Sequence, residues 1–214
     1  MAVDAPALQR TLESVSPSRR PAFGASCAQR LSRCFLNSRV RAERPVDAQT
    51  IEFALDKAWE SSLTGSIADV ADIRAKLEAM PEYSLEEEPD SLEAFRLDLL
   101  VILDATLRSC EDGSPRHLLL AARRAFDAAW FLEGRLHIPE GPVDPLDDSV
   151  PSWKNPSTQD RAMHFHTREL DHQEADLALI SSMGPTGWEA ALHSMRESSQ
   201  AYANDFWQVL RRQY

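Results

Sequence analysis

Apolar residues recur along most of the chain at the three- and four-residue spacing that places side chains on one face of an α-helix. Between residues 47 and 64, one such face carries an apolar residue at every fourth position: Ile51, Leu55, Trp59 and Leu63. The most hydrophobic segment is 91–112, which predicts a helix at the centre of a bundle. Its apolar positions are Leu92, Phe95, Leu99, Ile102, Leu103 and Leu107. Clear strand-like alternation of apolar and polar residues is rare.

Turn-forming residues divide these patterns into about seven predicted helices. Asp47 is the expected cap of the second helix and Gly65 its end, while Gly113 and Pro115 separate two later helices. The expected ranges are 21–43, 47–64, 66–80, 91–112, 115–134, 158–182 and 187–214. The chain is therefore predicted to be all-α. It would form one domain over residues 1–214, an antiparallel helical bundle without a sheet.

Two segments fall outside the helical pattern. Residues 1–20 are expected to form a flexible N-terminal arm, and residues 135–157 a long loop that contains five prolines. A loop of that length in a compact domain is more often functional than idle. The aromatic residues follow the same division. Trp153 lies in the proline-rich loop, whereas helical core spacing is found for Trp59, Trp130, Trp188 and Trp207.

The charge of the chain narrows the classes of partner. The net charge is −11, but residues 1–45 hold eight arginines against three acidic residues, so the remainder carries −16. Such an acidic body repels nucleic acid and anionic membranes and favours a basic protein partner. The arginines of the first segment are expected to pair with this acidic body, and phosphate contact is the alternative.

No apolar run has the length of a signal peptide or of a membrane span, which predicts a cytoplasmic protein. The three cysteines, Cys27, Cys34 and Cys110, are expected to be reduced and mostly buried.

Two acidic loops are the candidate contacts for a basic partner. Residues 81–90 contain five carboxylates and no basic side chain, and the proline-rich loop adds three aspartates that precede its tryptophan. The predicted partner-binding residues are Glu82, Glu86, Glu87, Glu88, Asp90, Asp144, Asp147, Asp148 and Trp153.

The stretch "HFHTRELDHQEAD" (164–176) is the one candidate for metal or acid/base chemistry, through His166, Glu169 and His172. A Glu-x-x-His spacing occurs twice in carboxylate-bridged di-metal bundles, but here a second copy is missing. On a helix, His164 and His166 would point about 200° apart and could not chelate together. The favoured interpretation is therefore a polar helix flank, with no metal, cofactor or catalytic residue.

Two further pairs of residues are open to a chemical role. Asp98 and Asp104 interrupt the hydrophobic helix 91–112. Burial would raise the pKa of either carboxyl group and suit it to acid catalysis. Pairing with Arg123 or Arg124 on the next helix is favoured instead. Glu189 and His193, four residues apart, are further possible ligands for a metal at the Glu169/His172 helix.

Five segments follow the order and spacing of a known family: "LDKAWESSL" (55–63), "AKLEAMPE" (75–82), "AFRLDLLVILDATLRSC" (94–110), "AARRAFDAAWFLEG" (121–134) and "RELDHQEADLALI" (168–180). Over residues 20–183 the chain resembles the YjaG-like family of bacterial all-helical proteins, a domain of unknown function. The resemblance implies a single helical domain in a bacterial cytoplasm and supplies no catalytic residue. The loop 139–156 and the final helix 187–214 depart from that pattern.

The leading functional hypothesis is a non-enzymatic acidic helical protein that binds and neutralises or regulates a cationic protein. Its most concrete form is an immunity protein for a bacterial toxin, such as a nuclease with a basic groove, because charge complementarity speeds association with basic partners. The alternatives are a metal-dependent or acid/base enzyme that uses the Glu169/His172 helix, and a housekeeping helical protein.

Overall fold

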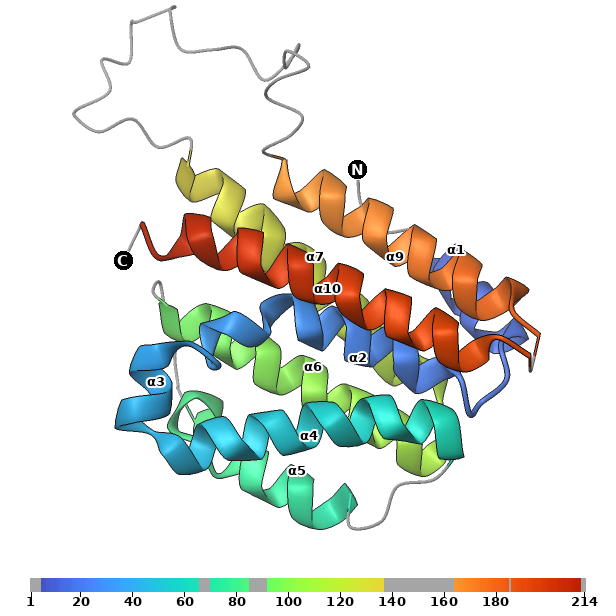
Figure 1. Cartoon of the computed structure of the whole chain (residues 1–214), viewed down its shortest axis with the longest axis horizontal. Coiled ribbons are helices and arrows are strands. Elements are labelled where there is room, and N and C mark those ends of the chain that lie inside the picture. The colour runs from blue at the N-terminus through green and yellow to red at the C-terminus, as the bar shows by residue number, and fades with distance from the viewer. Residues whose placement is uncertain (1–4, 66–69, 85–91, 137–163, 185, 213–214) are drawn as a thin grey trace, which may run out of the picture.

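The computed structural model describes residues 5–65, 70–84, 92–136, 164–184 and 186–212, and every regular element in these ranges is a helix. The predicted all-α class is confirmed, but these ranges contain nine α-helices, not seven, and two short 3-10 helices (Figure 1). The elements are α1 (Ala5–Ser14), α2 (Arg20–Leu31), η1 (Ser32–Cys34), α3 (Ser38–Glu43), α4 (Pro45–Thr64), α5 (Val70–Glu78), η2 (Pro81–Ser84), α6 (Leu92–Asp112), α7 (Pro115–Leu136), α9 (Phe165–Ser182) and α10 (Trp188–Leu210).

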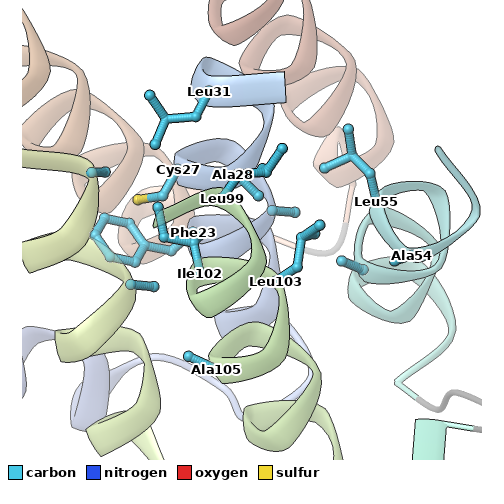
Figure 2. Packing of buried hydrophobic residues seen from close by; sticks show 14 of the residues in the cluster. Phe23, Cys27, Ala28, Leu31, Ala54, Leu55, Leu99, Ile102, Leu103 and Ala105 are labelled. Atoms are coloured by element: carbon cyan, nitrogen blue, oxygen red, sulfur yellow. The ribbon is translucent and has the colours of Figure 1, made fainter. Parts of the chain in front are cut away.

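Helix α2 is the centre of the molecule. All of its residues from Pro21 to Leu31 are buried, and it packs against α4, α6, α7, α9 and α10. Figure 2 shows Phe23, Cys27 and Leu31 of this helix among the leucines and alanines of α4 and α6. Small residues make the crowding possible: a Cβ on Gly24 would lie only 2.3 Å from Thr106 Oγ1 of α6. The hydrophobic helix α6 is therefore a neighbour of the central helix.

The other long helices surround α2 as hairpins. Helix α7 returns alongside α6, and α10 returns alongside α9, so that each pair is antiparallel (Figure 1). The C-terminal end of α7 and the N-terminal end of α9 therefore lie at the same end of the molecule (Figure 1). Helix α4 packs on the opposite side of α2 from α9, and α5 packs in turn against α4 and α6 (Figure 1).

Three boundaries agree with the predicted turn residues. Gly65 ends α4 and Gly113 follows α6, both with positive φ angles of 73° and 69°. The Ser114 hydroxyl accepts a hydrogen bond from the Arg116 amide at 3.4 Å, and Pro115 is the first residue of α7. Helix α4 begins earlier than expected, at Pro45, so that Asp47 lies in its first turn and is not its cap.

The first predicted helix, 21–43, is wrong. The chain leaves α2 at Leu31, forms the 3-10 turn η1 and starts α3 only at Ser38. The side chain of Asn37 caps α3, accepting a hydrogen bond from the Val40 amide at 3.1 Å. The flexible arm is wrong as well for residues 5–14, because they form α1 and bury Leu8 and Leu12 against the core.

Two predictions about side chains have opposite outcomes. Trp130 was expected in the core, but it is 61% exposed on α7. The three cysteines are free thiols, as predicted; Cys27 and Cys34 are buried and Cys110 is half-buried. No helix among the described residues combines the length and the apolar character needed to cross a membrane.

Candidate functional site

Three of the eight arginines of the first segment, Arg30, Arg41 and Arg44, pair with carboxylates beyond residue 45 in the described part of the chain, so the predicted pairing holds in part. Arg30 forms the most buried of these contacts. Its guanidinium is fully buried on α2 and bonds both carboxylate oxygens of Glu169 at 2.8 Å. It also donates to Asp176 at 2.8 Å, to Ser26 at 2.6 Å and to the Cys27 sulfur at 3.3 Å. The five N–H groups of the guanidinium are thereby all used. Through these contacts Arg30 connects α2 to α9. Because both carboxylate oxygens of Glu169 accept hydrogen bonds from Arg30, Glu169 is not available to bind a ligand.

The predicted trio His166, Glu169 and His172 does not converge. Glu169 is buried against Arg30, so it does not belong to an acidic surface either. The ring of His172 packs on Tyr202 with 5.1 Å between centroids, and its Nδ1 lies 3.4 Å from the Ser198 hydroxyl. Burial and the nearby positive charge of Arg30 lower the pKa of His172 below its usual value. His166, Glu169 and His172 therefore do not form one shared metal or acid/base site.

A different trio does converge at the end of the molecule where α7 meets α9. Glu133, on the last turns of α7, places its two carboxylate oxygens 2.6 Å from His164 Nδ1 and 2.5 Å from His166 Nδ1. The expectation that the two histidines diverge is wrong. His164 precedes α9 and has a non-helical ψ angle of 87°, so the 100° step of a helix does not separate the two rings.

The aspartates inside the hydrophobic helix are paired, as favoured from the sequence. Asp98 lies 3.2 Å from Arg124. Asp104 accepts hydrogen bonds from Arg74 on α5 and from Arg108 one turn later on α6, both at 2.7 Å. Arg124 is thus one of the two expected partners, and Arg74 and Arg108 take the place of the other. Neither carboxylate remains as a candidate acid.

Of the nine predicted partner-binding residues, only Glu82 lies in the described part of the chain. Glu86, Glu87, Glu88, Asp90, Asp144, Asp147, Asp148 and Trp153 lie outside the described residues. The exception, Glu82, is buried with only 3% of its surface exposed. Both of its carboxylate oxygens accept hydrogen bonds from Arg44, and Arg96 lies 3.7 Å away. Glu82 therefore joins η2 to the end of α3 and is not exposed as the predicted partner contact requires.

An open groove between α4 and α10 was not foreseen from the sequence. Its volume is about 1040 Å³, and buried Trp59 and Leu192 lie at its base, with the half-exposed Leu63 beside them. The polar residues that line it are Asp56, Glu60, Glu189, His193 and Arg196. Three carboxylates thus face one arginine, so the polar lining is acidic.

The exposed side of α4 continues this surface. Five large hydrophobic side chains are strongly exposed among the described residues, and three of them lie on α4: Val46, Phe53 and Leu63. Phe53 lies one turn before Asp56, and Leu63 one turn after Glu60, which places all four on one face of the helix. Phe53 and Leu63 therefore add exposed apolar area beside the acidic residues of the groove.

Comparison with known proteins adds no relative to this description. No family model, no curated protein and no solved structure matches the chain. The resemblance to the YjaG-like family over residues 20–183 stays a prediction.

Proposed function

We propose that this chain is a non-enzymatic binding protein for a cationic protein partner, and that the partner docks in the groove between α4 and α10. The observation that carries the proposal is the composition of this groove, which combines an apolar base with an acidic rim. A partner must supply apolar contact for the exposed Leu63 and positive charge for the carboxylates around it.

A lysine- or arginine-bearing segment meets both requirements. The aliphatic stem of a basic side chain packs on apolar surface while its charged end remains at the rim. Glu60 and Glu189 stand on the two walls of the groove, one on α4 and one on α10, and both are exposed. Asp56 is paired with Arg196 across the groove, whereas Glu60 pairs with Lys57 on its own helix. A solvent-accessible pair of this kind contributes little, so an incoming basic side chain can compete for Glu60, and Glu189 is the matching contact on α10.

The net charge of −11 adds a long-range contribution to the same preference. A strongly acidic protein attracts basic proteins before contact, and this attraction raises the rate at which it associates with them. The same charge repels nucleic acids. In its most concrete form the proposal is a cytoplasmic immunity protein that neutralises a bacterial toxin, such as a nuclease with a basic active-site groove. The acidic residues 86–90, the acidic residues 144–148 and Trp153 would then be additional contacts.

The test is a pair of charge-reversal variants of equal net charge. Glu60→Lys/Glu189→Lys alters the groove, and Asp171→Lys/Glu174→Lys alters exposed carboxylates on α9. Proteins retained from an extract of the native host by the immobilised wild-type chain are identified by mass spectrometry, and the most enriched one is purified for direct binding measurements.

The expected partner is basic, and the groove variant should bind it at least about tenfold more weakly than the α9 variant does. The affinity of both the wild type and the α9 variant should fall as salt is added, because screening weakens attraction between exposed charges. Recovery of an acidic partner, or an equal loss of affinity in the two variants, would refute docking in the groove.

A further inference from the structure

We propose that Glu133, His164 and His166 form a binding site for one divalent transition-metal ion, with Zn²⁺ as the representative of the class. One ligand atom from each residue lies within 4.8 Å of the other two, the only such three-residue group found among the described residues. The site is separate from the α4–α10 groove, and it adds a ligand to the protein independently of the proposed function.

The fold brings the three residues together from two helices. Glu133 lies near the end of α7, and His164 and His166 lie at the start of α9, where the two helices pack against each other (Figure 1). The non-helical backbone of His164 turns its ring back to the carboxylate that His166 also contacts. The centroids of the two imidazole rings are only 5.8 Å apart. Both rings therefore face the carboxylate of Glu133, and a cation placed between the three side chains would contact all of them.

The type of ligand selects the class of metal. Two imidazole nitrogens and one carboxylate are the protein ligands of many zinc centres and of several other transition-metal centres. Calcium and magnesium prefer oxygen ligands alone, so they are disfavoured here. Three protein ligands also leave at least one coordination position for water or another small ligand, whereas a structural zinc site is closed by four protein ligands.

The charge and burial of Glu133 favour a cation. Its side chain is only 11% exposed, and in the described part of the chain its partners are the two imidazoles. Among the described residues no lysine or arginine pairs with this carboxylate, and a divalent ion bound between the three groups would compensate its charge.

A second observation concerns the other nitrogen of His164. His164 Nε2 is buried and has no hydrogen-bond partner among the described residues. Buried polar atoms are nearly always satisfied, and one that is not indicates a functional group or a bound ligand. Each imidazole offers two nitrogens to a metal, and Nε2 of His164 is one that no described residue occupies.

Metal binding requires only a small opening of the cluster. Tetrahedral zinc with bonds of about 2.0–2.1 Å keeps neighbouring ligand atoms about 3.3 Å apart. In the structure each Nδ1 lies 2.5–2.6 Å from its carboxylate oxygen, so side-chain shifts of under about 1 Å make room for the ion. Coordination by Nδ1 requires the ring proton to be on Nε2, so a neutral ring that now shares its Nδ1 proton with the carboxylate changes tautomer as the metal binds.

The test uses the full chain, produced without a histidine tag and stripped of metal with a chelator. Zn²⁺ is titrated by calorimetry, and Co²⁺ serves as the probe for coordination geometry through its visible absorption. The variants are His164→Asn/His166→Asn and Glu133→Gln. The matched control is His117→Asn/His193→Asn, which removes two imidazoles that pair with Asp112 and Glu197 elsewhere on the surface.

The wild type and the control should each bind one equivalent of Zn²⁺, and Co²⁺ should give the intense visible bands of a four-coordinate ion. Both ligand variants should bind Zn²⁺ about 100-fold more weakly or worse, a larger effect than the loss of an outer-shell contact. Circular dichroism verifies folding, and if the double variant unfolds, the near-isosteric Glu133→Gln decides. The proposal is overturned if the wild type lacks a saturable one-equivalent site, or if that site survives in Glu133→Gln.

Discussion

Replacing Arg30 by methionine should cost more stability than most single substitutions in this chain. The change leaves the carboxylates of Glu169 and Asp176, which are 1% and 7% exposed, without the cation that satisfies them. Breaking a buried ion pair by removing one partner costs about 3–5 kcal/mol. Since a domain is stable by about 5–15 kcal/mol, the variant should lose a large part of its free energy of unfolding.

Two companion variants separate charge from volume. Arg30→Met/Glu169→Gln/Asp176→Asn removes all three charges, keeps the contacts of positions 169 and 176 with Gln173 and Ser26, and should recover more than half of the loss. Arg30→Lys should fall between wild type and Arg30→Met, because an ammonium group cannot form the paired contact with both oxygens of Glu169. Arg39→Met, in an exposed pair with Glu43, should change stability by less than about 1 kcal/mol.

Urea unfolding followed by circular dichroism measures these differences, provided that the slope of the free energy against urea concentration is the same in each variant. A loss below about 1 kcal/mol in Arg30→Met would refute the reasoning, because it would mean that water or a rearranged side chain compensates the two carboxylates at little cost. A triple variant as unstable as Arg30→Met would show that lost packing, and not charge, sets the effect.

Three other predictions concern residues that are buried or partly buried. Gly24→Ala should destabilise the chain by about 1–3 kcal/mol in urea unfolding, because its Cβ would meet Thr106, and an unchanged stability would contradict this close packing. Burial and Arg30 lower the pKa of His172, so the unfolded chain binds the proton more readily and stability should fall as pH drops through about 6.5. This part of the pH dependence should disappear in His172→Asn, and equal slopes in the two proteins would rule it out. Burial raises the pKa of Cys110 to about 11 and that of Cys34 to about 12. An aromatic disulfide reagent at mildly alkaline pH should therefore label these thiols in the native protein at least about 100-fold more slowly than in the urea-unfolded protein. Rapid labelling of the native protein would contradict this prediction.

The helical class and most helix boundaries could be predicted because they depend on neighbouring residues. Apolar spacing and the positions of Gly65, Gly113 and Pro115 are local signals. The break after Leu31 was missed because apolar spacing continues to Phe35, although Asn37 was a readable cap. Trp130 was misplaced for a geometric reason: alanines fill the buried face of α7, and Trp130 lies about 140° around the helix from Ala125.

The ligand trio could not be predicted from the same local signals. Glu133 is separated from His164 and His166 by 31 and 33 positions, and a single sequence does not show which helices pack together. The sequence reasoning also assumed that His164 lies within a helix, and one non-helical residue was enough to reverse the direction of its ring. The pairing of Arg30 with Glu169, at a separation of 139 residues, was equally hidden.

The contacts of Arg30 with Glu169 and Asp176 also fix the position of α9 along its axis relative to α2. Glu169 and Asp176 are two helical turns apart and share a single guanidinium, so a slide of α9 by one turn, about 5.4 Å, would remove both carboxylates from their cation. Such a slide would carry His164 and His166 away from Glu133 by the same distance. An inserted or deleted residue between Phe165 and Glu169 should therefore break the contacts at the end of the helix while leaving the helix itself in register.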